Sequence, residues 1–313
     1  MPPEAEKPVN NVLSPVRHEP GVISASSPLM WLNLLSLDAP AVAVLWQLLF
    51  ARCFHVRLSP GVTVLLGLVV WMIYVSDRLL DVWRTPAQRT EAIRHRFYRR
   101  HWRGFLLPMG VAFLLAGWMS LKYLDAQTFR GGIALSLAVG IYFALIHLRQ
   151  PVKHPWLPKE MLVGVLFGLG TCFPVWERLP DHGVLMLGPY LVFTTLCWIN
   201  CAAIEYSEWA HLRQRQFNSP HPWTIGVGRH LTLAASATAI ISLCFIPANS
   251  GNLAWPLLAA ETLSAAVFAA LGLRSQLLST DQFRVLMDLA LFTPILFFPL
   301  CIPGVVDPPL VVR

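Results

Sequence analysis

Nine long apolar stretches run through this sequence, and each has about the length that a membrane-spanning helix requires. They lie at residues 37–54, 62–79, 104–122, 130–148, 160–177, 184–204, 224–246, 253–272 and 284–303. A helix that crosses the hydrocarbon core of a bilayer needs about 20 predominantly apolar residues. Charged residues make up only 13% of the chain, about half of the share that is typical of soluble domains. The sequence therefore predicts an all-α integral membrane protein with nine transmembrane helices.

The residues outside these stretches predict a simple domain organisation. Residues 1–27 are rich in proline and charged residues and contain no apolar core, so we expect a disordered cytoplasmic tail. The connections between the apolar stretches are short, and several contain proline or glycine, such as Pro60-Gly61. Residues 28–313 are therefore expected to form a single nine-helix transmembrane domain.

The distribution of basic residues predicts how the helices are oriented. Loops on the cytoplasmic side of a membrane carry an excess of Lys and Arg. The N-terminal tail and the even-numbered loops hold 18 of the 24 Lys and Arg residues, while the odd-numbered loops and the C-terminus hold 6. We therefore expect a multi-pass protein of a cell inner or plasma membrane, with its N-terminus in the cytoplasm and its C-terminus outside.

Two clusters of acidic residues lie at the ends of two expected helices. Asp77 and Asp81 are four residues apart near the end of the second helix and share one of its faces. Glu205 and Glu208 are three residues apart near the end of the sixth helix, with Asn200 one to two turns earlier. Both helices run toward the cytoplasm in the predicted orientation, so we expect the two clusters at the same depth.

Acidic side chains at helix C-termini need a compensating cation, because the helix dipole already places negative charge there. Nearby arginines, such as Arg78 and Arg84, offer one solution through interfacial ion pairs. A bound Mg²⁺ offers another, since it prefers carboxylate oxygens and often takes phosphate oxygens as its remaining ligands. The spacing of the acids does not choose between these two interpretations.

Three further acidic residues lie within or beside the apolar stretches. Glu261 lies in the middle of the eighth expected helix, where an acid is expected to face the bundle interior, either in a functional role or with a structural partner. Asp288 is four residues after Arg284 and could form a pair with it. Asp38 begins the first helix, where the dipole favours an acid, and is interpreted as an N-terminal cap.

Four segments of the chain resemble motifs of the UbiA-type intramembrane prenyltransferase superfamily. Residues 73–81 resemble its first acidic motif, NDxxDxxxD, with Asp77-Arg78 and Asp81 in register and Ile73-Tyr74 in place of the leading Asn-Asp. The sequence AIEYSEW, residues 203–209, resembles the second acidic motif, with glutamates for aspartates. The segment LDAPAVAVLWQ, residues 37–47, looks like the family's first helix, and residues 149–170 are similar to its Lys-containing approach to the fifth.

This resemblance implies a fold and a function. The fold is a bundle of nine helices around a central cavity, and the reaction is Mg²⁺-dependent transfer of a prenyl group from a prenyl diphosphate to a lipophilic, membrane-embedded acceptor. The implied catalytic and metal-binding residues are Asp77, Asp81, Glu205 and Glu208, with Asn200 as a neutral metal ligand. The implied diphosphate-binding residues are Arg78, Lys159 and Arg84.

Two alternatives remain open on the same residues. The loss of the leading Asn-Asp and the glutamates of the second motif also fit a UbiA-like protein that has lost catalysis and serves in lipid binding or assembly. The pattern Glu208-x-x-His211 occurs in di-iron carboxylate bundles, and would make the protein a membrane oxidase, although the sequence contains no second such pattern.

A strongly basic segment adds an expectation about partners. Residues 84–103 contain seven arginines. Such segments bind the anionic lipids of the cytoplasmic leaflet, and they can also attract anionic substrates. We expect membrane lipids as partners and no nucleic acid.

Overall fold

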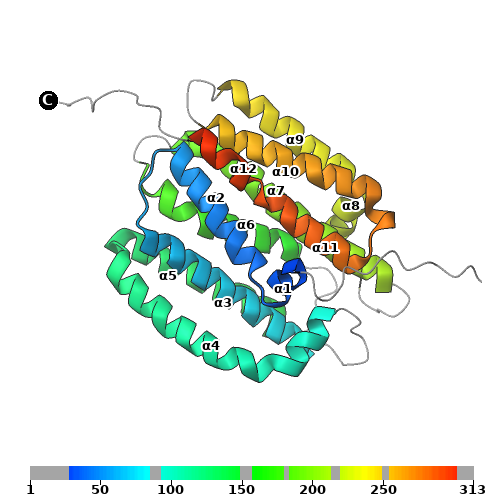
Figure 1. The fold of residues 1–313 in the computed structure, drawn as a ribbon, viewed down its shortest axis with the longest axis horizontal. Helices are drawn as coiled ribbons and strands as arrows, with labels where there is room; N and C mark the ends of the chain where they lie inside the picture. Colours follow the sequence, from blue (N-terminus) through cyan, green and yellow to red (C-terminus); the bar gives the residue numbers. More distant parts are fainter. Residues whose placement is uncertain are drawn as a thin grey trace, which may run out of the picture.

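The computed structural model describes residues 28–84, 93–148, 157–179, 183–212, 219–248 and 254–301. These residues form helices joined by turns, and no strand occurs among them. Figure 1 shows the helices packed as a bundle, with α3, α4 and α5 on one side and α9 and α10 on the other. The expected tail, residues 1–27, lies outside the described part of the chain.

Seven helical segments of the described chain are long and apolar enough to cross a membrane. Four are single helices, and three continue into further short helices. They are α3 (Pro60–Arg84), α4 (Ile93–Tyr123), α5 (Ala126–Phe143) with η2 (Ala144–Leu148), α6 (Lys159–Trp176), α7 (Gly183–Leu212), α10 (Trp255–Arg274) with η3 (Ser275–Leu277), and the series α11 (Thr280–Leu289), η4 (Ala290–Phe292), α12 (Pro294–Phe297) and η5 (Phe298–Cys301). Each coincides with an expected apolar stretch, as in a multi-pass membrane protein.

The other two expected stretches differ from a simple span. Residues 224–246 form two helices, α8 (Pro222–Arg229) and α9 (Leu231–Ala248), with a bend of 82° between them at His230. Together the two helices are long and apolar enough for one broken span or a re-entrant loop. The first stretch forms α2 (Asp38–Cys53), which has 16 residues and is therefore about 24 Å long, against about 30 Å for the hydrocarbon core. The described chain thus has seven candidate spans, or eight with the bent pair, where the sequence predicted nine.

The end of α2 has a local cause that apolar composition does not reveal. His55 adopts a left-handed conformation, with φ of 53°. The N–H of Val56 donates to the carbonyl of Ala51 at 2.8 Å, and the N–H of His55 to that of Arg52 at 3.1 Å. This is the Schellman arrangement, which satisfies the last carbonyls of a helix and ends it.

α1 (Pro28–Leu34) ends in the same way, with a consequence for the polar groups nearby. Ser36 has a φ of 56°, and the N–H of Leu37 donates to the carbonyl of Leu32 at 2.8 Å. The tight turn reverses the chain between α1 and α2. It thereby brings Asn33, on the last turn of α1, against Asp38, the first residue of α2.

α2 lies at the centre of the bundle and packs against helices from both ends of the chain. Trp46 and Phe50 are fully buried and contact the ring of Phe193 on α7. The indole N–H of Trp46 donates to the carbonyl of Leu291 in η4 at 2.8 Å. The first and last parts of the described chain are therefore joined in the core.

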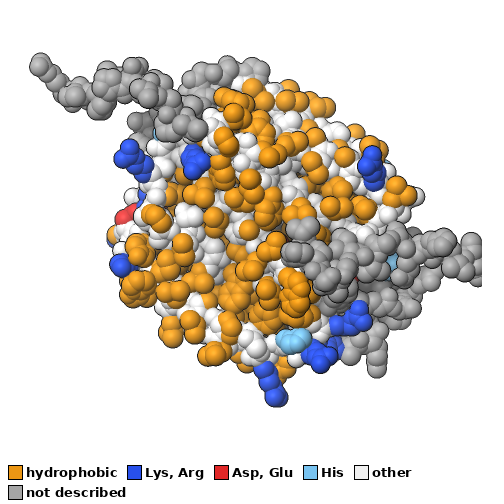
Figure 2. All heavy atoms as spheres, in the orientation of Figure 1, with side chains coloured by type: hydrophobic (Ala, Val, Ile, Leu, Met, Phe, Trp, Pro, Cys, Tyr) orange, Lys and Arg blue, Asp and Glu red, His pale blue; other side chains and the backbone are white. Residues whose placement is uncertain are grey.

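The outer helices present apolar side chains outward, as a lipid-facing surface requires. Leu107 and Leu121 on α4 are 77% and 78% exposed, and Leu233 on α9 is 70% exposed. Figure 2 shows hydrophobic side chains over most of the visible face, with Lys and Arg near its margins. An apolar exterior of this kind is stable only when lipid or detergent covers it.

One contact provides a direct test of this packing. The sulfur atoms of Cys53, at the end of α2, and Cys301, in η5, lie 3.4 Å apart although the residues are 248 positions apart in sequence. We expect mild copper–phenanthroline oxidation to join these two thiols in a disulfide, because two thiols held this close need little movement to bond. The disulfide would be detected by mass spectrometry of proteolytic fragments.

Replacement of Cys53 by Ser is expected to abolish this cross-link. Replacement of the exposed Cys244 by Ser is expected to leave it unchanged. Absence of a Cys53–Cys301 fragment after complete oxidation would contradict the packing of α2 against the C-terminal helices.

Candidate functional site

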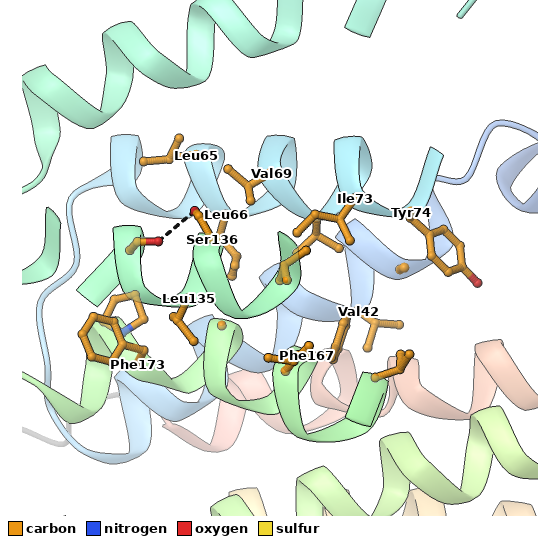
Figure 3. A pocket seen from close by; sticks show the side chains of 18 of the residues that line it. Val42, Leu65, Leu66, Val69, Ile73, Tyr74, Leu135, Ser136, Phe167 and Phe173 are labelled. Atoms are coloured by element: carbon orange, nitrogen blue, oxygen red, sulfur yellow. Dashed lines mark hydrogen bonds between the residues drawn. The ribbon is translucent and has the colours of Figure 1, made fainter. Parts of the chain in front are cut away.

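A cavity of about 350 Å³ lies between α2, α3, α5, α6, α7 and α11. Most of its wall is apolar. In Figure 3, Leu65, Val69, Ile73 and Tyr74 follow one another along α3 on one side of the cavity, opposite Phe173 and Phe167 of α6. Since Leu65 and Tyr74 are nine residues apart on one helix, this wall extends about 14 Å. The shape and lining suit an elongated apolar molecule.

The chemistry of the wall changes along the cavity. Toward Phe173 and Leu65 the lining is mainly apolar, and Figure 3 shows the hydroxyl of Ser136 among these side chains. Near Tyr74 the cavity is lined by three polar side chains from three helices, Asp38 of α2, Asn200 of α7 and Asp288 of α11. The cavity therefore has one polar end, which we call the acceptor end because carboxylate and amide oxygens gather there.

The side chains of the acceptor end form one hydrogen-bonded cluster. The amide group of Asn33 donates to Asp38 Oδ2 at 2.8 Å and to Asp288 Oδ2 at 3.4 Å. The amide group of Asn200 donates to Asp288 Oδ1 at 3.0 Å. Asp38 Oδ1 also accepts from the N–H of Ala39 at 3.0 Å. Elements from both ends of the sequence are needed to build this cluster.

Two sequence expectations about these acids are corrected. The residue at the N-cap position of α2 is Leu37, and Asp38 is the first helical residue, so its carboxylate lies in the first turn and also binds Asn33. Asp288 was expected to pair with Arg284 on its own helix. Its hydrogen-bond partners are instead the amides of Asn33 and Asn200, while Arg284 acts on it only electrostatically.

The two glutamates of α7 are paired with cations. Glu208 forms ion pairs with Arg284 of α11 and with Arg94 of α4, the latter at 3.2 Å. Glu205 accepts from Lys159 at the start of α6 at 3.2 Å. Lys159 also lies 3.9 Å from Glu160, whose carboxylate accepts a hydrogen bond from Thr224 of α8 at 2.7 Å. Three helices thus supply the cations that neutralise the acids of α7.

The acids of α3 lie close to the same cations. Asp77 and Asp81 are both half-buried. Asp81 and Glu205 both act electrostatically on Lys159 and on Arg94. The two acidic clusters, which are about 125 residues apart in sequence, therefore act through Asp81 and Glu205 on the same Lys and Arg side chains. We call this group, Asp77, Asp81, Lys159, Glu205, Glu208, Arg94 and Arg284, the ionic cluster.

Arg94 is buried in a region with a high density of positive charge. Burial lowers the pKa of its guanidinium from the usual value, and the nearby charge of Arg78 lowers that pKa further. Its Nε has no hydrogen-bond partner in the described part of the chain. Arg94 lies within the basic segment, where composition offers no signal that separates it from the arginines that face lipid headgroups.

Arg78 is the most unusual cation of the region. It is 5% exposed, and its guanidinium lies 4.5 Å from the centre of the Tyr74 ring. None of its three nitrogens has a hydrogen-bond partner among the described residues. A buried guanidinium offers five N–H donors, and buried charged groups are normally paired. The side chain of Arg84, the other arginine expected here, lies outside the described part of the structure.

The ion pairs of Glu205 and Glu208 involve residues that the sequence predicts to bind Mg²⁺. In the described chain, no three His, Cys, Asp or Glu residues come together in a group that could hold a metal ion. Glu205 and Glu208 already contact Lys159, Arg94 and Arg284, so both glutamates would have to exchange these cations to bind Mg²⁺. The five-residue magnesium site therefore stays a prediction, and the di-iron alternative gains no ligand group.

The deeply buried acid Glu261 lies apart from this region. It is fully buried in α10, and its Oε2 lies 3.4 Å from the hydroxyl of Ser242 on α9. It faces the bundle interior, as expected for an acid in the middle of an apolar helix. It does not line the cavity, so the structure connects it with the packing of α9 on α10 rather than with the candidate site.

Sequence reasoning missed Asn33, Arg94 and Arg284 as members of the site. Asn33 lies before the first apolar stretch and carries no motif. Arg284 gave a weak signal, since a cation at the start of an apolar stretch needs an acid, but its partner is on α7 rather than on its own helix. Comparisons with known proteins add no further guide, because no family model, curated protein or solved structure matches this chain.

The ion pairs of α7 predict unequal effects of two similar substitutions. Glu208→Gln leaves two arginines without their carboxylate, and Arg284 is only 3% exposed. Because removing one partner of a buried ion pair strands the other charge, we expect the free energy of unfolding to fall by about 3 kcal/mol. Urea denaturation in detergent, followed by tryptophan fluorescence, measures this change.

Glu205→Gln is the matched control. Its partner Lys159 is 44% exposed and Glu205 itself is 34% exposed, so we expect a loss of about 1 kcal/mol or less, as for solvent-screened pairs. Equal losses in the two variants would show that the Arg94–Glu208–Arg284 group does not carry the stability assigned to it.

Proposed function

We propose that this protein binds a prenyl diphosphate, with the isoprenoid chain in the apolar cavity and the diphosphate beside Arg78, and transfers the prenyl group to a lipophilic acceptor. It would then be a divergent UbiA-type prenyltransferase. The observation that carries the proposal is the buried guanidinium of Arg78, which has no hydrogen-bond partner among the described residues and lies next to the polar end of a long apolar cavity.

The charge of Arg78 argues for an anionic ligand. A buried charge without a hydrogen-bonded counter-ion is unfavourable; Arg78 is 5% exposed and has no such partner among the described residues, although Asp38 acts on it electrostatically. Guanidinium groups bind phosphate oxygens in a bidentate, charge-assisted geometry. Arg94 Nε and Arg284 Nε are also buried without partners in the described chain. A ligand with many acceptor oxygens and negative charge would satisfy all three arginines.

The cavity argues for an apolar chain on that ligand. Its wall along α3 and α6 is formed by side chains such as Val69, Ile73 and Phe167. A chain of isoprene units would bury apolar surface along this wall, at about 25 cal/mol for each Å². The charged end of such a molecule would stay near Tyr74 and Arg78.

In the proposed reaction, the bond between the allylic carbon and the diphosphate oxygen breaks, and the acceptor forms a new bond to that carbon. Arg78 and Lys159 stabilise the negative charge that builds on the departing diphosphate. The acceptor loses a proton as the bond forms. Mg²⁺, if bound by Asp77, Asp81, Glu205, Glu208 and Asn200, would neutralise part of the same charge.

The proposal includes an arrangement in the membrane. The ionic cluster and the acceptor end would face the cytoplasm, with the N-terminus in the cytoplasm and the C-terminus outside, in a cell inner or plasma membrane. The basic segment 84–103 would contact anionic lipids there. α2 and the bent pair α8–α9 would supply the remaining two of nine passes, in a locally thinned or partly protein-covered environment.

A second candidate function is prenyl-lipid binding without turnover. It is favoured by the ion pairs that hold Glu205 and Glu208, and by Ile73-Tyr74 at the positions where the resembled motif has Asn-Asp. In this case Lys159, Arg94 and Arg284 take the place that metal ions would otherwise fill. Binding would then be independent of Mg²⁺, and no prenylated product would form.

Replacement of Arg78 tests the diphosphate site. We expect Arg78→Gln to weaken binding of geranylgeranyl diphosphate at least ten-fold, because one charge-assisted contact contributes about 1.5–3 kcal/mol, and Arg78→Lys to weaken it less. Isothermal titration calorimetry on the detergent-solubilised protein, with and without Mg²⁺, measures the affinity. Unchanged affinity in Arg78→Gln would refute this site.

Arg100→Gln is the control for non-specific attraction. Arg100 is exposed on α4, and we expect its replacement to leave the affinity within two-fold. Mass spectrometry of lipid extracts, incubated with the protein and the diphosphate, then separates the two candidates. A prenylated lipid supports transfer, while Mg²⁺-independent binding with no product supports the binding protein.

A further inference from the structure

We infer that the acceptor end of the cavity is a second binding site, which takes the hydroxyl group of an uncharged amphiphile such as a long-chain alcohol or a phenol. The site is formed by Asn200, Asp288, Asp38 and Asn33, of which the sequence motifs single out only Asn200. The inference goes beyond prenyl transfer, since it depends on the cavity and on Asn200 and needs no diphosphate to be bound.

The hydrogen-bonded cluster at the acceptor end contains more acceptors than donors. The amide group of Asn33 has two N–H donors, and it has two acceptors, Asp38 and Asp288. The amide group of Asn200 donates to Asp288. Each carboxylate oxygen has room for a further hydrogen bond. Oxygen acceptors in the cluster therefore outnumber its donors.

One acceptor is conspicuous because it has no partner. Asn200 Oδ1 is buried without a hydrogen bond in the described part of the chain, and the whole residue is 8% exposed. Asn200 also lines the cavity. A buried amide oxygen without a donor is unfavourable, because it has lost its hydrogen bonds to water and gained none in return. A ligand in the cavity that brings a donor to this oxygen would recover that free energy.

The unpartnered oxygen of Asn200 determines which kind of group a ligand must bring to it. An ether, a ketone or a quinone offers only acceptors and would leave Asn200 Oδ1 unsatisfied. A hydroxyl group donates one hydrogen bond. An ammonium group would also donate, and the carboxylates of Asp38 and Asp288 would attract it, but the positive charges of Arg78 and Arg284 nearby offset these two negative charges. The surrounding charge thus favours a neutral hydroxyl.

The cavity wall beyond Asn200 determines what the rest of the ligand must be. From Asn200 the cavity continues along apolar side chains of α2 and α3, including Val42, Ile73 and Val69. Figure 3 shows Val42 and Ile73 between the Tyr74 end and the Phe173 end. A hydroxyl held at Asn200 would therefore carry an apolar body along this wall, which is the arrangement of an amphiphile inserted head first.

This site is separate from the proposed diphosphate site. Tyr74 lines the cavity, while Arg78 lies over the ring of Tyr74 and is not part of the cavity wall. The hydroxyl site therefore belongs to the wall of the cavity, while the anion site at Arg78 lies outside that wall, next to Tyr74.

The experiment compares two ligands that differ only in the donor. Binding of dodecan-1-ol and of its methyl ether is measured on the full-length protein in detergent, without Mg²⁺ or diphosphate, and corrected for partition into protein-free micelles. We expect the alcohol to bind at least ten-fold more tightly than the ether, because only the alcohol can donate to Asn200 Oδ1.

Substitutions in the cavity test which residue causes the preference for the alcohol over the ether. Asn200→Ala is expected to reduce the ratio of alcohol to ether affinity to near one while ether binding persists, which also shows that the cavity is intact. Asp288→Asn is a second variant that removes a carboxylate acceptor, and we expect a smaller reduction of the ratio. Ser136→Ala is the matched control, since Ser136 also lines the cavity but already donates to the carbonyl of Gly132 at 2.8 Å. Its ratio is expected to match the wild-type ratio.

Two results would overturn the inference. One is equal binding of alcohol and ether by the wild-type protein, which would make the cavity a purely apolar site. The other is a wild-type ratio in both Asn200→Ala and Asp288→Asn. Because no diphosphate is present, failure of the Arg78 experiment leaves this test valid, and failure of this test leaves diphosphate binding at Arg78 untouched.

Discussion

The bundle depends on the neutralisation of charged side chains among apolar helices. A charged group that leaves water needs a partner of opposite charge, and a membrane protein must supply that partner from its own chain. Glu208 of α7 holds Arg94 of α4 and Arg284 of α11, and Glu205 holds Lys159 of α6. Four helices are thereby joined at one end by a few ion pairs.

The buried groups that lack a hydrogen-bond partner are informative because so many of their neighbours are paired. Among the described residues, Arg78 has donors without acceptors, and Asn200 has an acceptor without a donor. Arg78 lies over the ring of Tyr74, and Tyr74 and Asn200 both line the apolar cavity. Protein interiors rarely leave such groups unsatisfied, so both point to ligands. One ligand group would be an anion and the other would carry a hydroxyl, and a molecule or pair of molecules with an apolar body would bring both.

Local sequence patterns predicted the helices well, and their limits have physical causes. Seven apolar stretches became helices of spanning length because apolar composition over about 20 residues is a strong signal. α2 is shorter because the backbone at His55 turns into the left-handed region and ends the helix. The bend at His230 is likewise a backbone event within an apolar run, where composition gives no warning.

The candidate site was predicted in part, and the reason lies in the range of the interactions. Motif spacing identified Asp77, Asp81, Glu205 and Glu208, whose neighbours within one helix are fixed by its periodicity. It did not identify Arg94 as the partner of Glu208 or Asn33 as the link between Asp38 and Asp288. Those pairs join residues 114 and 255 positions apart, and one-dimensional spacing carries no information about them.

Residue types along the chain were enough to predict that it is helical, apolar enough for a membrane, and charged mainly at the ends of its expected spans. These properties follow from the residue types within a single helix and its loops. Only the tertiary structure decided which cation pairs with which acid, which buried groups are left without a partner, and which residues share one cavity. Such contacts arise between helices, because electrostatics and packing act across space and not along the chain.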